Sequence, residues 1–205
     1  ASTSWWRKSQ ATWQIPDCAG AVVMDMKRAR VVVVEDERIK DVLPSGKVGA
    51  LDAEIDLASK SGTRTVPIAA FYEGPLMTVR RPDEILSQVR FPIWSENTIG
   101  VGFQEVSPRH GDFAIVAVAA QLGFDSDGIC RRAAVALGGA SPNPVRAAEL
   151  EASLFGQRID EALLDKIVGS IDRVLTPTDD LHASAAYRRR VARALTVRAI
   201  LEASE

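Results

Sequence analysis

The sequence predicts an α+β protein, in which one antiparallel sheet is followed by a small antiparallel sheet and a three-helix group at the C-terminal end. Two observations predict this class. Short β-branched or alternating segments separated by turn residues fill the first half, and helix-length segments separated by glycine and proline fill the last third. Strand runs followed by helix runs, rather than alternation, indicate α+β. We place a boundary near 94–100, which predicts domains at 1–95 and 96–205.

Strands dominate the predicted first domain. Val31–Glu35 opens with four consecutive valines and is typical of a buried strand. Ala53–Ala58 alternates apolar and acidic residues, and after a Ser-Gly turn Arg64–Ile68 forms the second strand of a hairpin. Pro67 cannot donate to a strand ladder, so we expect it at a strand end or on an edge. A tight bend then leads into a strand at Ile85–Phe91.

The second domain begins with strands. A strand is predicted at Thr98–Val106. Periodicity alone leaves Phe113–Phe124 open as strand or helix, because a continuous apolar run fits both. The turn signal Asp125–Gly128 and the apolar run Ile129–Leu137 after it favour a hairpin. Gly138-Gly139 then ends the strand region.

Three helices complete the predicted fold. Pro144 is expected at the start of a helix covering Val145–Phe155, where its missing N–H costs nothing. A second helix is expected at Ile159–Leu175. Asp179-Asp180 is expected to cap a last helix that runs to about Ala203 and places His182 in its first turn. Its predicted apolar stripe consists of Tyr187, Val191, Ala194 and Leu201.

Composition excludes several function classes. The net charge is −2, so the chain lacks the cation surplus of a nucleic-acid-binding surface. No apolar run reaches the roughly 20 residues that span a bilayer, and the first residues lack a secretory pattern, so the cytoplasm is the expected compartment. Cys18 and Cys130 have no CxxC partner, and we expect buried free thiols rather than metal or iron–sulfur ligands.

The segment Gly102–Phe113 is the strongest candidate site, because six polar or charged side chains lie there between apolar segments. Sites are often built on such turns, where a rigid scaffold holds free side chains. His110 within it is either a site residue or a solvated turn residue. A second cluster is open between a partner-facing patch and a solvated helix face. It consists of Arg188, Arg189, Arg190, Arg193 and Arg198.

Six ordered blocks of the sequence carry a family resemblance. They are Gly49–Leu57, Gly62–Pro67, Arg81–Leu86, Gly102–Val106 with Arg109, Gly111 and Asp112, Ala136–Ala140 with Pro144 and Arg146, and Asp180–Arg188. Together they resemble the medium, flavin-binding subunit of molybdenum hydroxylases of the carbon monoxide dehydrogenase and xanthine dehydrogenase group.

The resemblance implies a fold and a function. Residues 1–95 would be part of an FAD-binding subdomain with an antiparallel sheet, and residues 96–205 the α+β C-terminal domain of the flavoprotein subunit. The FAD would pass electrons to an acceptor. Partner subunits would carry the molybdenum cofactor (large subunit) and [2Fe-2S] clusters (small subunit) in a hetero-oligomer. The implied flavin-side residues are Asp41, Leu86, Gln104, Arg109, Gly111, Asp112 and Phe113.

The sequence also departs from the family pattern. Gln104 stands where some members have a lysine near the flavin ring, and the spacing around Asp41 differs. Two Gly-rich loops bind the FAD pyrophosphate through backbone N–H groups in the family, and residues 1–47 show neither loop. Three hypotheses follow. The chain is an electron-transfer flavoprotein subunit, a non-catalytic assembly subunit that keeps the fold but has lost the cofactor, or an unrelated soluble α+β binding domain, which the ordered blocks disfavour.

Overall fold

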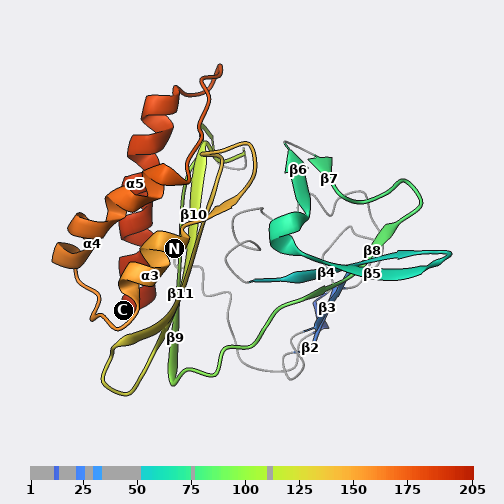
Figure 1. Cartoon of the computed structure of the whole chain (residues 1–205), viewed down its shortest axis with the longest axis horizontal. Helices are drawn as coiled ribbons and strands as arrows, with labels where there is room; N and C mark the ends of the chain where they lie inside the picture. Colours follow the sequence, from blue (N-terminus) through green and yellow to red (C-terminus); the bar gives the residue numbers. More distant parts are fainter. Residues whose placement is uncertain (1–11, 14–21, 26–29, 34–51, 75–76, 110–112) are drawn as a thin grey trace.

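A computed structural model describes residues 12–13, 22–25, 30–33, 52–74, 77–109 and 113–205 of the chain (Figure 1). It confirms the α+β class, with antiparallel sheets and a C-terminal group of helices. The first sheet has the strand order β1-β2-β3-β8-β4-β5. These strands are β1 (Thr12–Trp13), β2 (Val22–Asp25), β3 (Arg30–Val33), β8 (Ile85–Arg90), β4 (Glu54–Ser59) and β5 (Gly62–Pro67).

The hairpin predicted in the first half is confirmed as β4 and β5, paired from Glu54↔Pro67 to Ser59↔Gly62. Pro67 is the last residue of the edge strand, where its missing N–H breaks no ladder. The alternation of β4 places Ile55 and Leu57 in an apolar core. The core continues through the short helix η1 (Ile68–Ala70), which leads to β6 (Tyr72–Gly74) and β7 (Met77–Thr78).

The second sheet has the order β12-β11-β10-β9. β9 (Thr98–Val106) has the predicted bounds, and β10 (Val116–Phe124) pairs with it over its full length. β10 and β11 (Cys130–Gly138) form the predicted hairpin, so the ambiguous apolar run is a strand. Alternate residues of β10 face the helices. Buried here are Val116, Val118, Ala120, Leu122 and Phe124.

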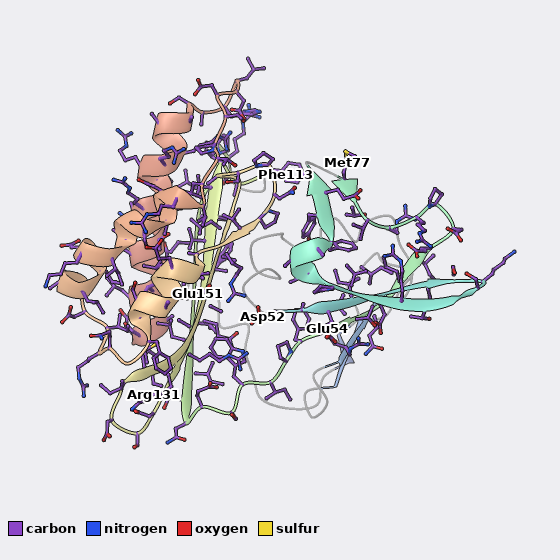
Figure 2. All side chains as sticks on the ribbon, in the orientation of Figure 1. Asp52, Glu54, Met77, Phe113, Arg131 and Glu151 are labelled. Carbon is purple, nitrogen blue, oxygen red and sulfur yellow. The ribbon has the colours of Figure 1, made fainter. Side chains whose placement is uncertain are left out.

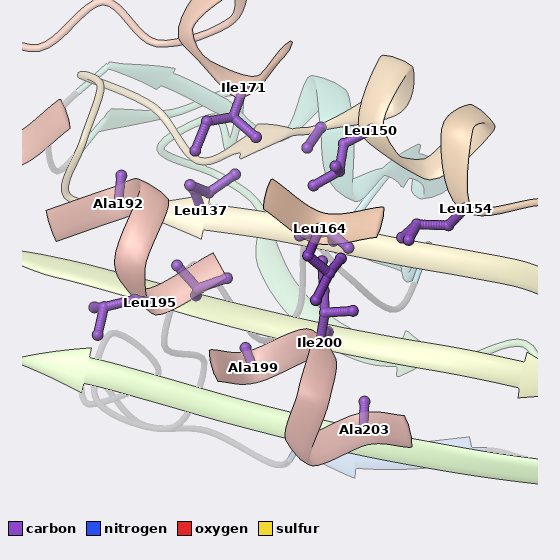
Figure 3. Packing of buried hydrophobic residues seen from close by; sticks show 14 of the residues in the cluster. Leu137, Leu150, Leu154, Leu164, Ile171, Ala192, Leu195, Ala199, Ile200 and Ala203 are labelled. Carbon is purple, nitrogen blue, oxygen red and sulfur yellow. The ribbon is translucent and has the colours of Figure 1, made fainter. Parts of the chain in front are cut away.

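Three helices cover one face of this sheet, and the first sheet lies on the other side of it (Figure 1). They are α3 (Ala148–Leu154), α4 (Glu161–Ile167) and α5 (Ala185–Ser204). Their apolar side chains interdigitate with those of β10 and β11 (Figure 3). The closely packed set includes Leu137, Leu150, Leu154, Leu164, Ile171, Leu195 and Ile200.

Helix α5 lies directly on β9 because glycine occupies the contact points. A Cβ on Gly102 would stand 2.0 Å from the carbonyl oxygen of Ala199, and one on Gly100 would stand 1.8 Å from that of Ala203. Both distances are far below van der Waals contact, so the helix backbone touches the strand backbone. The small side chains on both elements therefore set the distance between helix and sheet.

The predicted stripe of α5 was wrong for this reason. The buried residues are Arg188, Ala192, Leu195, Thr196, Ala199, Ile200 and Ala203, whereas Ala194 is exposed and Tyr187 is half-buried. The prediction selected larger side chains, but the glycine-bearing strand requires alanines at the closest contacts. Val191 and Leu201 pack only at the margin of the core.

Three helix boundaries also differ from expectation. Pro144 does not start a helix: β12 (Val145–Arg146) follows it and pairs with Leu137 and Ala136 before α3 begins. The expected helix at 159–175 is divided into α4 and the 3₁₀ segment η2 (Val168–Arg173). The N-cap of α5 is Ser184, whose hydroxyl accepts from Tyr187 N at 3.2 Å. Asp180 and His182 lie in the preceding loop, where Asp180 accepts from the His182 backbone N–H at 2.8 Å.

The glycine contact predicts that Gly102→Ala destabilises the second sheet. The new methyl group must push α5 away, and overpacking of this kind costs about 1–3 kcal/mol. Chemical denaturation followed by circular dichroism measures the free energy of unfolding. Gly169→Ala is the matched control, because nothing lies within 4 Å of a Cβ there, and its change should stay within about 0.5 kcal/mol. Equal effects of the two substitutions would refute the close contact.

Candidate functional site

Two hydrogen bonds shape the segment between β9 and β10, one between backbone groups and one from a serine side chain. Ile115 N donates to Val106 O at 2.8 Å, and Ser107 Oγ donates to the carbonyl of Arg109 at 3.0 Å. Phe113 stands at the end of this segment with 88% of its surface exposed. A bare phenyl ring on a fixed backbone is a ready contact for a flat apolar partner.

The side chain of Gln104 forms a hydrogen bond with Glu202 of α5. Its Nε2 donates to Glu202 Oε2 at 2.8 Å, and the same oxygen accepts the backbone N–H of Phe103 at 3.1 Å. Because β9 is an edge strand, the carboxylate of Glu202 occupies a backbone donor that would otherwise be open. Sequence reasoning missed Glu202, since no local pattern links a helix C-terminus to a strand about 100 residues earlier.

The other predicted residues fall in several places. Leu86 is buried in the core of the first sheet, opposite Leu57. Arg109 is exposed. Asp41, Gly111 and Asp112, together with His110 and Cys18, lie outside the described residues. Arg109 and Phe113 thus lie in the segment between β9 and β10, whereas Gln104 lies in β9 with its side chain toward α5. Leu86 lies on the other sheet.

The side of the second sheet away from the helices carries a small apolar cluster of its own. Ala119 and Ala136 are buried there and pack with Phe103. Figure 2 shows Phe113 on this side, toward the first sheet, and Met77 at the tip of β7 on the opposing half. Met77 is 59% exposed. Apolar groups are thus exposed on both halves at the same end of the molecule.

Two buried amide atoms, one on β8 and one in the loop before β12, have no hydrogen-bond partner among the described residues. β8 carries a bulge opposite Asp56/Leu57, where Ser87 Oγ donates to Asp56 O at 3.2 Å. Bulges are frequent beside sites. Next to it, the buried Gln88 Nε2 has no hydrogen-bond partner in the described structure, and the same holds for Asn143 Oδ1. Asn143 Nδ2 donates to Tyr72 O at 3.3 Å and so joins the halves.

An ion-pair network also spans the two halves. Asp52, which has a φ of 49°, accepts from Arg146 NH1 at 2.5 Å. Arg146 donates through Nε and NH2 to both carboxylate oxygens of Glu151, at 2.7 and 2.9 Å. Glu151 also accepts from Val135 N at 2.7 Å. The planar guanidinium of Arg146 bonds Glu151 through two nitrogens and Asp52 through the third. Such bidentate pairing fixes the orientation of the guanidinium as well as its distance, so Asp52 is held against the second sheet.

Two sequence hypotheses on other side chains can be compared with the structure. Cys130 is a buried free cysteine, as predicted, and burial raises the pKa of its thiol. In the arginine cluster, Arg188 is buried, and Arg193 forms an ion pair with Asp172. Arg189 donates to Asp172 O at 3.2 Å. These contacts within the chain account for part of the cluster without a partner.

In the first sheet, Glu84 holds the bend that precedes β8. Arg64 Nε and NH2 donate to its two carboxylate oxygens at 2.6 and 2.9 Å, and Arg81 N donates at 2.8 Å. These bonds, above all those from Arg64, lower the pKa of Glu84 from its ordinary 4.5 to about 2. The charged carboxylate thus fixes the start of the strand that carries Leu86.

Comparison with known families identifies both halves. The CO dehydrogenase flavoprotein C-terminal domain matches residues 102–203, and the FAD binding domain in molybdopterin dehydrogenase matches residues 33–94. The glyceraldehyde dehydrogenase medium chain of Sulfolobus acidocaldarius is 31% identical over 154 residues, which cover 75% of this chain and 53% of the relative. The carbon monoxide dehydrogenase medium chain of Afipia carboxidovorans is 29% identical over 150 residues, covering 73% and 51%.

A solved structure shows the same fold as this chain. The Cu,Mo-CO dehydrogenase in its cyanide-inactivated form superimposes with a TM-score of 0.72 at 27% identity, covering 81% of this chain and 60% of that one. The fold and its two matched domains define a flavoprotein-subunit architecture. The chain belongs to the family of medium, FAD-binding subunits of the carbon monoxide and xanthine dehydrogenase group. It spans about half the length of the curated relatives it matches.

Among the described residues, no helix is both long and apolar enough to cross a membrane. The same residues contain no group of three or more His, Cys, Asp or Glu placed to hold a metal ion.

The Glu84 contacts predict a pH dependence. Its pKa is lower in the folded protein than its ordinary value, so its stabilisation is full above about pH 4.5 and is lost as the pH falls toward 2. Glu84→Gln should flatten the dependence of unfolding free energy on pH in this window. Denaturation between pH 2 and 6 measures it. Asp83→Asn, an exposed neighbour, is the control; equal slopes for both variants would contradict the role of Glu84.

Proposed function

We propose that this chain is the flavin-binding, electron-transfer subunit of a molybdenum hydroxylase complex. The observation that carries the proposal is Phe113, which is held exposed toward the first sheet within a matched flavoprotein domain. Bound FAD would supply the redox chemistry, taking electrons from iron–sulfur clusters and passing them to an acceptor. The chain's own residues would hold the ring, orient it and limit access of water.

The roles of the residues follow from their positions. Phe113 would lie over the ring, and Arg109, with Gly111 and Asp112, would shape the segment around it. Gln104 lies on the helix-facing side of the edge strand β9, opposite Val118 and bonded to Glu202, so it would act on the ring from behind the strand rather than by direct contact. Leu86 would act from the first sheet, next to the bulge at Ser87, and Asp41 would add an acidic contact. The buried, unpartnered Gln88 and Asn143 amide atoms are compatible with a polar ligand between the halves.

The partners in this proposal are a molybdenum-binding large subunit and an iron–sulfur small subunit in a hetero-oligomer. The molybdenum cofactor and [2Fe-2S] clusters would lie on those chains. The relative from Afipia carboxidovorans is itself the medium chain of a carbon monoxide dehydrogenase. The division into domains at 95/96 belongs to the same proposal, with FAD held between the two parts, and the cytoplasm stays the predicted compartment.

A second candidate is a non-catalytic assembly subunit that has lost FAD. The observation that favours it is the lack of both Gly-rich phosphate loops in residues 1–47. If no other part of the protein supplies such N–H donors, the pyrophosphate loses its anchor. The two candidates differ in one property, which is bound flavin.

The first prediction from this proposal is a flavin spectrum. The natively purified protein, with any chains that copurify, should absorb in the blue and release FAD on denaturation. Stoichiometry is measured by absorbance and by chromatography of the released cofactor. A colourless protein that also fails to take up added FAD would favour the assembly subunit instead.

The second prediction concerns Gln104. A cation near the ring favours the more negative, reduced flavin. β9 is an edge strand, so the longer lysine of Gln104→Lys can reach round it toward the ring, and this variant should raise the midpoint potential. Glu202 would partly neutralise the new ammonium, and adding Glu202→Gln should enlarge the shift. For an exposed charge worth up to about 1 kcal/mol, the shift is on the order of 20 mV in a two-electron couple.

A redox titration of the FAD-loaded protein measures these midpoints. Glu202→Gln alone is the control for loss of the carboxylate. Identical midpoints in wild type, Gln104→Lys and the double variant would place Gln104 away from the ring.

A further inference from the structure

Arg188 is an arginine in the first turn of α5 that is only 7% exposed. Its Nη1 donates to two backbone carbonyls, those of Ile115 at 2.6 Å and Gly139 at 2.8 Å. Its Nη2 donates to Asp180 Oδ2 at 2.5 Å. A buried charge is costly unless it is paired and hydrogen-bonded, and here one guanidinium joins three separate segments.

The three segments meet at one end of the second sheet. Ile115 is the last residue before β10, and Gly139 is the first after β11. Gly139 has a φ of 77°, and a Cβ there would stand 2.5 Å from Ile115 O and 3.0 Å from Ala114 O. Only glycine allows this approach. Gly139 therefore lets the chain entering β10 come close, and Arg188 fastens it there.

Asp180 completes the arrangement from the other side. Its Oδ1 accepts the backbone N–H groups of His182 and Ala183, at 2.8 and 2.9 Å, while Oδ2 faces Arg188. These contacts, with that of Arg188 foremost, lower the pKa of Asp180 from 3.8 to about 2. The carboxylate thus stays charged at neutral pH and aims the guanidinium at the two carbonyls.

We propose that Arg188 is a positioning residue: it fixes the backbone at Ile115 and thereby sets where Phe113, two residues earlier, is presented. The inference rests on the proposed function for its consequence, which is placement of the flavin ring. The sequence suggested a charged helix face here, whereas the structure places this arginine behind the candidate site. It acts through the backbone carbonyls of Ile115 and Gly139.

The test compares the full chain with Arg188→Met and Arg188→Lys. Lysine keeps a cation for Asp180 but lacks the planar fork that reaches both carbonyls, so it covers the case in which methionine prevents folding. Arg198→Met, an exposed arginine on the same helix, is the control. Hydrogen exchange is followed at two amides: Ile115, bonded to Val106 O, and Cys130, bonded to Gln157 O at the opposite end of the sheet.

Loss of charged hydrogen bonds should accelerate exchange at Ile115 by about tenfold or more, while exchange at Cys130 stays unchanged. Titration with FAD, followed by flavin fluorescence, should show a parallel loss of affinity. Unchanged exchange at Ile115, or equal acceleration at both amides, would overturn the positioning role. Faster exchange at Ile115 alone with unaltered FAD affinity would uphold that role and contradict contact between this segment and the flavin.

If the wild-type chain takes up no FAD, the proposed function fails, and the exchange measurement still decides on Arg188. The two proposals are therefore tested separately.

Discussion

The contact of α5 with β9 is the constraint on which the C-terminal half depends. Gly100 and Gly102 let the helix backbone reach the strand, so that Ala199 and Ala203 sit against it. This contact sets the helix axis, and the axis carries Arg188 to one end of the sheet and Glu202 to the edge of β9. Arg188 bonds to the segment between β9 and β10 at Ile115, and Glu202 bonds to β9 itself at Phe103 and Gln104. Packing on one face of the sheet thus determines what the opposite side presents.

Charged side chains organise the rest of the site. Arg188 fixes the strand ends, Arg146 holds Asp52 across the two halves, and Arg64 with Glu84 fixes the bend before β8. Each is a forked arginine with more than one acceptor, which specifies orientation better than a single ion pair. The backbone that would surround a flavin ring is therefore held by polar contacts at three points, and the exposed apolar groups, such as Phe113, are left free to meet a ligand.

Local patterns predicted the strands well, because turn residues and alternation act over a few residues. β9, the β10–β11 hairpin and Pro67 at an edge follow from such signals. The helix boundaries failed where tertiary contacts decide: β12 exists because it pairs with β11, and the buried face of α5 is chosen by the glycines of β9. Of the candidate site, the segment at 102–113 was found from its polar side chains between apolar segments, and its role toward a flavin from the family resemblance. Glu202 and the role of Arg188 depend on distant contacts and had no local signal.

In the proposed function, the flavin ring lies against the segment ending at Phe113, between the two sheets. Photolabelling with an azido analogue of FAD, mapped by peptide mass spectrometry on the native protein, tests it most directly. We expect covalent label on the peptide that contains residues 102–115, with protection by excess FAD. Label confined to other peptides would contradict this position of the ring. Label on this peptide that excess FAD does not prevent would contradict it as well.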